Sequence, residues 1–544
     1  MSKFSANRRE LMKMLGGVTA GTGLIASPAG MLLEAMTRGV FGRAIAQTGG
    51  LTPRKWIDMR FDVSPPRWVY DLFLTPYAGG AAFQANPQVG TRYVEANGRY
   101  TDVEYATVTM RGIKVPWLWK YPVPAANGGE RSMAPLLDNL LQMRGVFVGN
   151  PDHTAAMKLH YRPLGAQQTL SALSADSSTA PIAALYFGVR GFEFGSNANN
   201  SPILLSGSNL INSLLAPFIS QSSQDFKNAR SDLRTYLRTA RNAFAADLKG
   251  KNPGHAISVE AQKSSHELFE TSFGDLTVVW DQLYNKYVSL IDRAFDPNRV
   301  MEGINDMPIG INASSRTNHY QSNDILVTNA DLRTMIQAQT TMATTMAQSF
   351  AIAEFVMSKN LSDSLSLVMG SIVKLSVNGS TVNHNQDEHF TGKMPSLLLN
   401  TYQSRAHAAC LLELIDRLKS PAINCFDETV INFSGEFNRR PRLDGTGSDH
   451  NYEGGNYTLL SGCVDGPIVI GNIKASNGQA AYPGTWGYGA PISSLGGQQL
   501  DLGYCAASIA TMLRTPSPIT ARSTVLEENS SGKIVPKIEL AKVV

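Results

Sequence analysis

The sequence predicts an α/β fold, with a central sheet flanked by helices and a helical hairpin inserted into it. Two observations predict it. Short runs rich in β-branched residues alternate with amphipathic helical stretches, as in parallel or mixed sheets. Polar residues suited to chemistry follow directly after several of those runs. Since sites in open α/β sheets form where loops leave the carboxyl ends of strands, we expect a site at that edge.

The composition is that of a globular protein. Of 544 residues, 43% are hydrophobic and 17% are charged, which allows a large core. The net charge of +4 is too small to argue for nucleic acid, and we expect no nucleic-acid partner. After the first 46 residues no stretch reaches about 18 uninterrupted apolar residues, so we expect no transmembrane span in the mature chain. The sequence does not determine the oligomeric state.

Residues 1–46 are predicted to be an export signal. The twin arginine Arg8-Arg9 resembles that of the bacterial twin-arginine pathway, and Ala44-Ile45-Ala46 gives an A-x-A cleavage signature. We therefore expect a mature domain of residues 47–544 in the periplasm or outside the cell. A cytoplasmic amphipathic N-terminus is the alternative. Because this pathway carries folded proteins, export fits a metal site that is filled before secretion.

The cysteines form no C-x-x-C motif, so neither a zinc knuckle nor a thioredoxin site is supported. In an oxidising compartment some of them can pair as disulfides, and four cysteines allow three pairings. They are Cys410, Cys425, Cys463 and Cys505.

The first strand is predicted at Trp56–Phe61, where apolar and polar residues alternate. Asp71 follows it and is either a metal-binding carboxylate or the cap of a turn. Residues 77–135 are rich in Gly, Pro, Asn and Tyr, which predicts loops and small strands such as Tyr105–Met110.

A short helix is predicted at Leu136–Met143, leading into an apolar strand at Gly145–Val148. Polar residues follow that strand as well. Among them, His153 and Thr154 are candidates for a metal ligand and a nucleophile. A solvated loop histidine is the alternative.

Residues 208–296 are predicted to form a long antiparallel helical hairpin, an insertion or cap on the domain. Apolar residues recur at spacings of three and four from Phe226 to Leu248 and from Phe269 to Ala294. A basic stripe at Arg230–Arg241 is suited to an anionic polymer or lipid headgroups. A solvated helix face is the alternative.

Three more helices are predicted at Asp331–Phe355, Ser396–Lys419 and Leu502–Leu513, and a buried strand at Leu365–Leu375. The segment after that strand contains His384, Asp387 and His389, which are metal-ligand types at close spacing. A polar surface loop is the alternative for this segment.

The chain is organised around residues 427–471. Thr429–Phe433 is short and β-branched, as an inner strand should be, and Glu436 follows at its carboxyl end. The pair Asp449-His450 lies further along the same loop. A carboxylate and an Asp-His pair at one strand end predict a metal or acid–base site. An ordinary surface loop with capping carboxylates is the alternative. No P-loop, dinucleotide fingerprint or G-x-S-x-G elbow occurs, which disfavours those chemistries.

Over residues 365–513 the chain resembles the bacterial DUF1501 proteins, an uncharacterised family related to the alkaline phosphatase and sulfatase superfamily. The matching pieces are Asp387-Glu-His389, Asp427-Glu-Thr429, the stretch GEFNRRPR from Gly435 to Arg442, and Asp449-His450. The resemblance implies an alkaline-phosphatase-like central sheet. It also implies one or two divalent ions, of zinc, manganese or calcium, at Asp71, Asp387, His389, Glu436, Asp449 and His450.

By the same resemblance, Arg439 or Arg442 would bind the oxyanion of an ester, and Thr154 would be the nucleophile. The chain departs from the family where the usual G-E-F-G-R-T-P has Asn438 and Arg440 in the changed places. No C-x-P-x-R or S-x-P-x-R motif occurs, so formylglycine chemistry is not supported.

These observations predict an exported, metal-dependent hydrolase of phosphate or sulfate esters, acting on an anionic envelope or extracellular polysaccharide. The alternative is a non-catalytic binding or assembly protein on a degenerate phosphatase-like fold. A lipid or polyanion binder that uses the basic stripe is a third hypothesis.

Overall fold

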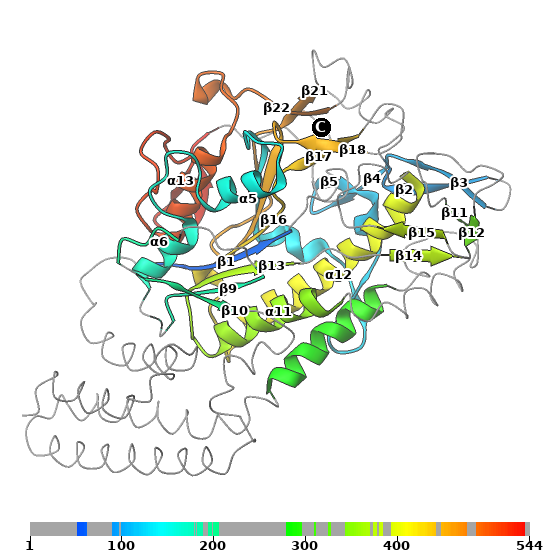
Figure 1. The fold of residues 1–544 in the computed structure, drawn as a ribbon, viewed down its shortest axis with the longest axis horizontal. Coiled ribbons are helices and arrows are strands. Elements are labelled where there is room, and N and C mark those ends of the chain that lie inside the picture. Colours follow the sequence, from blue (N-terminus) through cyan, green and yellow to red (C-terminus); the bar gives the residue numbers. More distant parts are fainter. Residues whose placement is uncertain are drawn as a thin grey trace, which may run out of the picture.

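The computed structural model (Figure 1) describes residues 52–538 with gaps. The gaps are 62–89, 97–98, 179, 181, 189–193, 199, 206–278, 296–308, 312–324, 328–342, 370–373, 378–379, 384–392, 442–447 and 476–485. The predicted export signal, the basic stripe, Asp71, His384, Asp387, His389 and Arg442 therefore lie outside the described residues.

The centre of the fold is an eight-stranded mixed sheet, mostly parallel, which confirms the α/β prediction. Only β19 runs antiparallel to its two neighbours, β16 and β8. Across the sheet the strands are β10 (Pro202–Leu205), β9 (Ala184–Phe187), β13 (Ser364–Val368), β1 (Lys55–Arg60), β16 (Thr429–Ser434), β19 (Gly455–Leu460), β8 (Leu140–Val146) and β20 (Ile468–Ile470).

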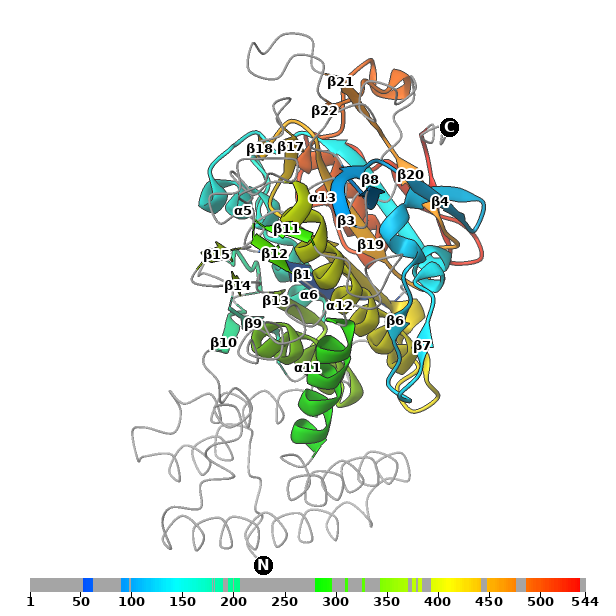
Figure 2. The same ribbon diagram turned by 90° about the vertical axis from the view of Figure 1, so that its right-hand side faces the viewer.

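Helices cover both faces of the sheet (Figure 1). On one face, α11 (Ala343–Ser358) and α12 (Lys393–Lys419) pack against the Ile57 side of β1. On the other, α5 (His153–Tyr161), α6 (Leu170–Ser177) and α13 (Leu502–Leu513) share a core with Trp56. Figure 2 shows α12 running along the sheet from the edge that carries β17 and β18. Within the described residues, no helix is long and apolar enough to cross a bilayer.

The described end of the predicted hairpin is a core helix rather than an exposed cap. Residues 279–294 are helical, and Tyr287, Leu290 and Ile291 are buried in the same core as α11 and α12. The hydroxyl of Tyr287 donates a 2.7 Å hydrogen bond to Glu354 of α11, which ties this helix to the body of the protein. The first helix of the hairpin lies outside the described residues.

Small strands surround the central sheet. A second sheet contains β12 (Ile325–Val327), β11 (Ile309–Ile311), β3 (Arg99–Glu104) and β2 (Arg92–Ala96). The hairpins are β4 (Thr107–Met110) with β5 (Ile113–Pro116), β6 (Val123–Pro124) with β7 (Glu130–Arg131), β14 (Lys374–Val377) with β15 (Ser380–Asn383), β17 (Asn438–Pro441) with β18 (Ser448–Asn451), β21 (Ile473–Ala475) with β22 (Trp486–Gly489), and β23 (Leu526–Glu528) with β24 (Ile534–Pro536). Short 3-10 turns are η1 (Trp117–Lys120), η2 (Ala134–Asn139), η4 (Phe426–Glu428) and η5 (Ser493–Leu495).

Two local predictions were wrong. The predicted helix Leu136–Met143 is helical only as far as Asn139, where the 3-10 turn η2 ends, and the chain enters strand β8 at Leu140. Strand β8 pairs with β19 on one side and β20 on the other, and this non-local pairing overrides the helix-like spacing of its leucines. The predicted strand Leu365–Leu375 is split, since β13 ends at Val368 and Lys374 begins a separate hairpin.

All four cysteines are free, so none of the three possible disulfide pairings is present. Cys410 lies in the core on the α12 side of the sheet, whereas Cys463 and Cys505 lie in the core on the α13 side. Burial raises the pKa of the Cys410 and Cys505 thiols well above the ordinary value. These thiols therefore act as small apolar core groups.

Candidate functional site

Three segments that are distant in sequence meet at the edge of the sheet where β8 and β16 end. Glu436 lies two residues beyond the end of β16. His153 is the first residue of α5, the helix that follows β8, and its backbone is fixed there because the Asp152 carboxylate accepts a 2.8 Å hydrogen bond from the Ala155 amide. His450 lies on β18, which leads into β19. Glu436, His153 and His450 thus lie near one another at the carboxyl edge of the sheet.

Glu436 and His153 are in contact, and one is buried while the other is partly exposed. The Glu436 side chain is 0% exposed, the His153 side chain is 33% exposed, and His153 Nδ1 is in hydrogen-bonding contact with Glu436 Oε1. With the carboxylate accepting from Nδ1–H, the lone pair of the neutral ring sits on Nε2. A buried carboxylate that orients a partly exposed imidazole is the arrangement of a general base and its orienting partner.

His450 stands next to this pair. Its ring centroid lies 4.5 Å from that of His153 in an edge-on arrangement, and 4.4 Å from that of Phe437. Its Nδ1–H donates a 2.6 Å hydrogen bond to the Pro151 carbonyl. Because a backbone acceptor on one ring nitrogen fixes the tautomer, Nε2 is the nitrogen of His450 that carries the lone pair.

A third histidine, His160, is fully buried and supports the backbone of Glu436. His160 Nε2–H donates to the Glu436 carbonyl, and the Tyr457 hydroxyl donates a 2.6 Å hydrogen bond to His160 Nδ1. Burial, and then the positive charge of Arg60, lower the pKa of His160 well below its ordinary value. His160 is therefore a neutral hydrogen-bonding group that holds the Glu436 loop in place.

A chain of hydrogen-bonded polar side chains links β1 and β16 next to the site. Arg60 Nε donates to Asp58 at 3.0 Å, and Asn432 Nδ2 donates to the other Asp58 oxygen at 2.6 Å. Ser434 Oγ then donates to Asn432 at 2.7 Å. Burial acts to lower the pKa of Arg60, but the Asp58 carboxylate acts to raise it, and the net shift is upward. Arg60 is therefore positively charged, and its Cζ lies 5.3 Å from the centroid of the Tyr457 ring.

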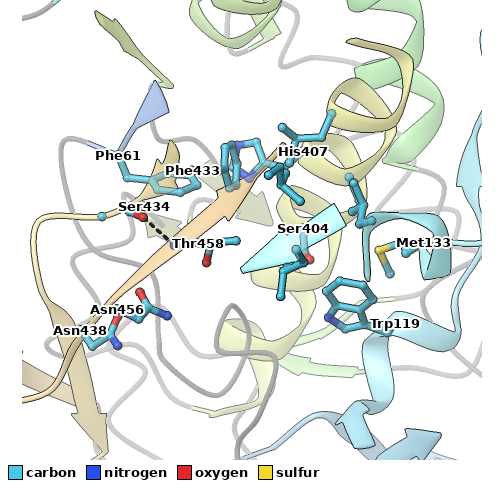
Figure 3. A pocket seen from close by; sticks show the side chains of 16 residues that line it. Phe61, Trp119, Met133, Ser404, His407, Phe433, Ser434, Asn438, Asn456 and Thr458 are labelled. Carbon is cyan, nitrogen blue, oxygen red and sulfur yellow. Dashed lines mark hydrogen bonds between the residues drawn. The ribbon is translucent and has the colours of Figure 1, made fainter. Parts of the chain in front are cut away.

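A cavity of about 60 Å³ borders the same loop (Figure 3). Gly435 and Asn438, on either side of Glu436, both line it. One wall is aromatic, since His407 lies edge-on to Phe61 and Phe433 at 4.9 and 5.1 Å between ring centroids. Burial lowers the pKa of His407 to about 3, so this ring is neutral.

The structure brings some of the predicted site residues together and separates others. Glu436 and His450 lie around His153, and Arg439 is fully buried on β17, opposite His450 in the hairpin. Asp449 lies opposite Arg440. Thr154 is exposed and lies one residue beyond His153, about 100° further around the helix. Among the described residues, no group of three His, Cys, Asp or Glu side chains is arranged to hold a metal ion.

Sequence reasoning missed the supporting groups Asp58, Arg60, His160 and Tyr457. A signal existed for the first two, because they place charges at two positions of one face in an otherwise buried strand. His160 and Tyr457 carry no such signal, since their roles depend on contacts between segments about 300 residues apart.

Comparisons of this chain with protein-family models, with curated proteins and with solved structures returned no match.

Proposed function

We propose that this protein is a hydrolase of phosphate or sulfate esters in which Glu436 and His153 form the acid–base pair. One observation carries the proposal: a fully buried carboxylate is bonded to a partly exposed imidazole at the carboxyl edge of an α/β sheet. The resemblance of the segment around Glu436 to DUF1501 proteins, and through them to phosphatases and sulfatases, supports the choice of ester.

In this proposal Glu436 holds the His153 ring with Nε2 directed away from the carboxylate. Nε2 accepts a proton from the attacking water or hydroxyl group and later returns it to the leaving alcohol. The partial exposure of His153 gives substrate access to this nitrogen. Arg439 or Arg442 would bind the anionic oxygens of the ester, and Thr154 is the nucleophile if the reaction passes through a covalent intermediate.

The resemblance also implies one or two divalent ions. The donor types are suitable, because His450 is oriented by the Pro151 carbonyl as metal-bound histidines are and Glu436 provides a carboxylate. His450 and Glu436, together with the predicted ligands outside the described residues, would hold zinc, manganese or calcium, whereas Asp449, the neighbour of His450 on β18, points to the other face of the strand. When bound, such an ion polarises the ester and stabilises the leaving oxygen. We further propose export by the twin-arginine pathway and an anionic envelope or extracellular polysaccharide as substrate.

The test uses the full-length protein purified without chelator, with 4-nitrophenyl phosphate and 4-nitrophenyl sulfate as substrates and elemental analysis alongside. His153→Ala and Glu436→Gln should each lower kcat by about 100-fold or more, the usual contribution of a general base and its partner. Glu527→Gln is the matched control, because Glu527 is an exposed carboxylate on β23. Full activity in both site variants would refute the assignment of the acid–base pair.

The second candidate is a non-catalytic exported binding protein. The exposure of Thr154, the only nucleophile that the sequence suggested, favours it. If the starting protein binds metal but cleaves neither ester, and metal is lost in His450→Ala, the binding protein is the better description.

A further inference from the structure

We propose that the cavity beside Glu436 is a subsite for the uncharged alcohol portion of the ester, and that it accepts a short alkyl or hydroxyalkyl group. The inference rests on the proposed function for the identity of the ester. It goes beyond that function because it names the part of the fold that would bind the leaving group of the substrate and select among leaving groups.

The position of the cavity links it to the proposed reaction centre. Gly435 and Asn438 line it, and Glu436 lies between them in the chain. His153 begins α5 on one side of the sheet and the cavity lies on the α12 side, so a molecule that spans the end of β16 would place its ester group at His153 and its remaining portion in this cavity. Figure 3 shows the amides of Asn438 and Asn456 at one end of the lining and Trp119 at the other.

The lining favours an uncharged group. Its sixteen residues include no Asp, Glu, Lys or Arg, and its one titratable side chain, His407, stays neutral because it is buried. The rings of Phe61, Phe433 and Trp119 supply apolar surface, whereas Asn438, Asn456 and Thr458 supply hydrogen-bonding groups. An apolar wall with a few polar groups is the usual construction of a small-molecule site. A charged group would lose its hydration here without gaining a counter-charge.

A buried amide next to the cavity points to a hydroxyl-bearing ligand. Gln142 is 0% exposed, and in the described part of the chain neither its Oε1 nor its Nε2 has a hydrogen-bond partner. Its cross-strand neighbour is Thr458, and Leu140 is two residues away on the same strand face; both line the cavity. Cross-strand neighbours share a face, so the amide lies on the cavity side of the sheet. A hydroxyl group both donates and accepts, as this amide requires.

The volume limits the size of the group. About 60 Å³ holds roughly four water-sized groups. A short alkyl or hydroxyalkyl group fits, whereas a complete sugar ring does not. A saccharide substrate would place one hydroxymethyl-sized substituent here and keep its ring outside.

The experiment separates this inference from the proposed function by measuring binding without catalysis. Dilute 2,2,2-trifluoroethanol, an uncharged alcohol, is titrated into the full-length protein and its fluorine NMR signal is followed. We expect saturable binding in the wild type and in Glu436→Gln, and at least a fivefold weaker affinity in Ala408→Leu, because Ala408 lines the cavity and the larger side chain fills it. Gln142→Leu should weaken binding too, and it keeps the test valid if Ala408→Leu does not fold.

Equal binding in the wild type, Ala408→Leu and Gln142→Leu, or no saturable binding at all, would overturn the inference whether or not the protein cleaves esters. A second measurement connects the subsite to catalysis. Phosphate release from n-propyl phosphate should have a lower KM than release from 2-aminoethyl phosphate, and Ala408→Leu should remove that preference. An unchanged preference in Ala408→Leu would count against the subsite. Alcohol binding without ester cleavage would contradict only the proposed function.

Discussion

The neutral state of His407 predicts a defined loss of stability between about pH 7.5 and pH 5.5. In the folded protein burial lowers the pKa of His407 to about 3, against the ordinary value of 6.5. The unfolded chain therefore takes up a proton near pH 6.5, whereas the folded chain does not until about pH 3. Stability is fully present above 6.5 and falls as the pH drops toward 3. The slope is about 1.4 kcal/mol per pH unit, so the loss at about pH 5.5 is about 1.4 kcal/mol.

His407→Phe removes this proton uptake while keeping a ring between Phe61 and Phe433. Urea unfolding at the two pH values should show that the variant loses about 1.4 kcal/mol less than the wild type on acidification. His160, whose pKa is also lowered, adds a similar loss to both proteins and cancels in the comparison. Phe433→Leu is the control, because it should destabilise equally at both pH values. An identical pH dependence in His407→Phe and the wild type would refute the reasoning.

Two further predictions concern stability alone. Gly145→Ala should lower the free energy of unfolding by about 3 kcal/mol or more, because φ is +79° and a Cβ there would lie 2.1 Å from the Asn472 carbonyl oxygen. Gly112 has the same φ but open space around it, so Gly112→Ala should lower it by only about 1 to 2 kcal/mol. Equal losses on urea unfolding would contradict the steric argument. Partial burial acts to raise the pKa of Asp176, but hydrogen bonds from Ser196 and its neighbours lower it, and the net result is a pKa below 3.8. Because the carboxylate is the better acceptor for these hydrogen bonds, Asp176→Asn should lower the free energy of unfolding by about 1 kcal/mol at neutral pH. This stability is present above pH 3.8 and is lost as the pH falls through the folded pKa, so the two proteins should converge in acid.

The parts of the fold that could be predicted are those whose pattern is local. The β-branched run at Thr429–Phe433 is β16, and the boundaries of α13 at Leu502–Leu513 match the prediction. Helix α13 begins after Asp501, whose carboxylate accepts from the Tyr504 amide, and ends at Arg514 in the left-handed region, so both ends are fixed by neighbouring residues. Of strand β8 only the end, Gly145 and Val146, was predicted, because its partners β19 and β20 lie about 300 residues further along the chain.

In the candidate site, too, the features that depend on local sequence could be predicted and the long-range contacts could not. Glu436 and His450 were identified from one segment, since a carboxylate after a buried strand is a local signal. His153 was noted, but its contact with Glu436 joins residues 283 positions apart and no spacing rule predicts it. The same holds for the support that His160 gives to the Glu436 carbonyl. Sequence patterns therefore predict which strand ends carry polar side chains, whereas the hydrogen bonds that orient His153 and Glu436 depend on contacts made only in the folded chain.

The single antiparallel strand explains why these segments meet. The chain leaves β16 at the carboxyl edge with Glu436, stays at that edge through the β17–β18 hairpin that carries His450, and enters β19 there. A parallel β19 would have to start at the opposite edge, and the chain would carry His450 away. Because β8 is in turn antiparallel to β19, its carboxyl end at Val146 pairs with Gly455, the first residue of β19. The loop that leads to His153, the first residue of α5, therefore leaves the sheet at the same edge, and the direction of one strand brings all three groups together.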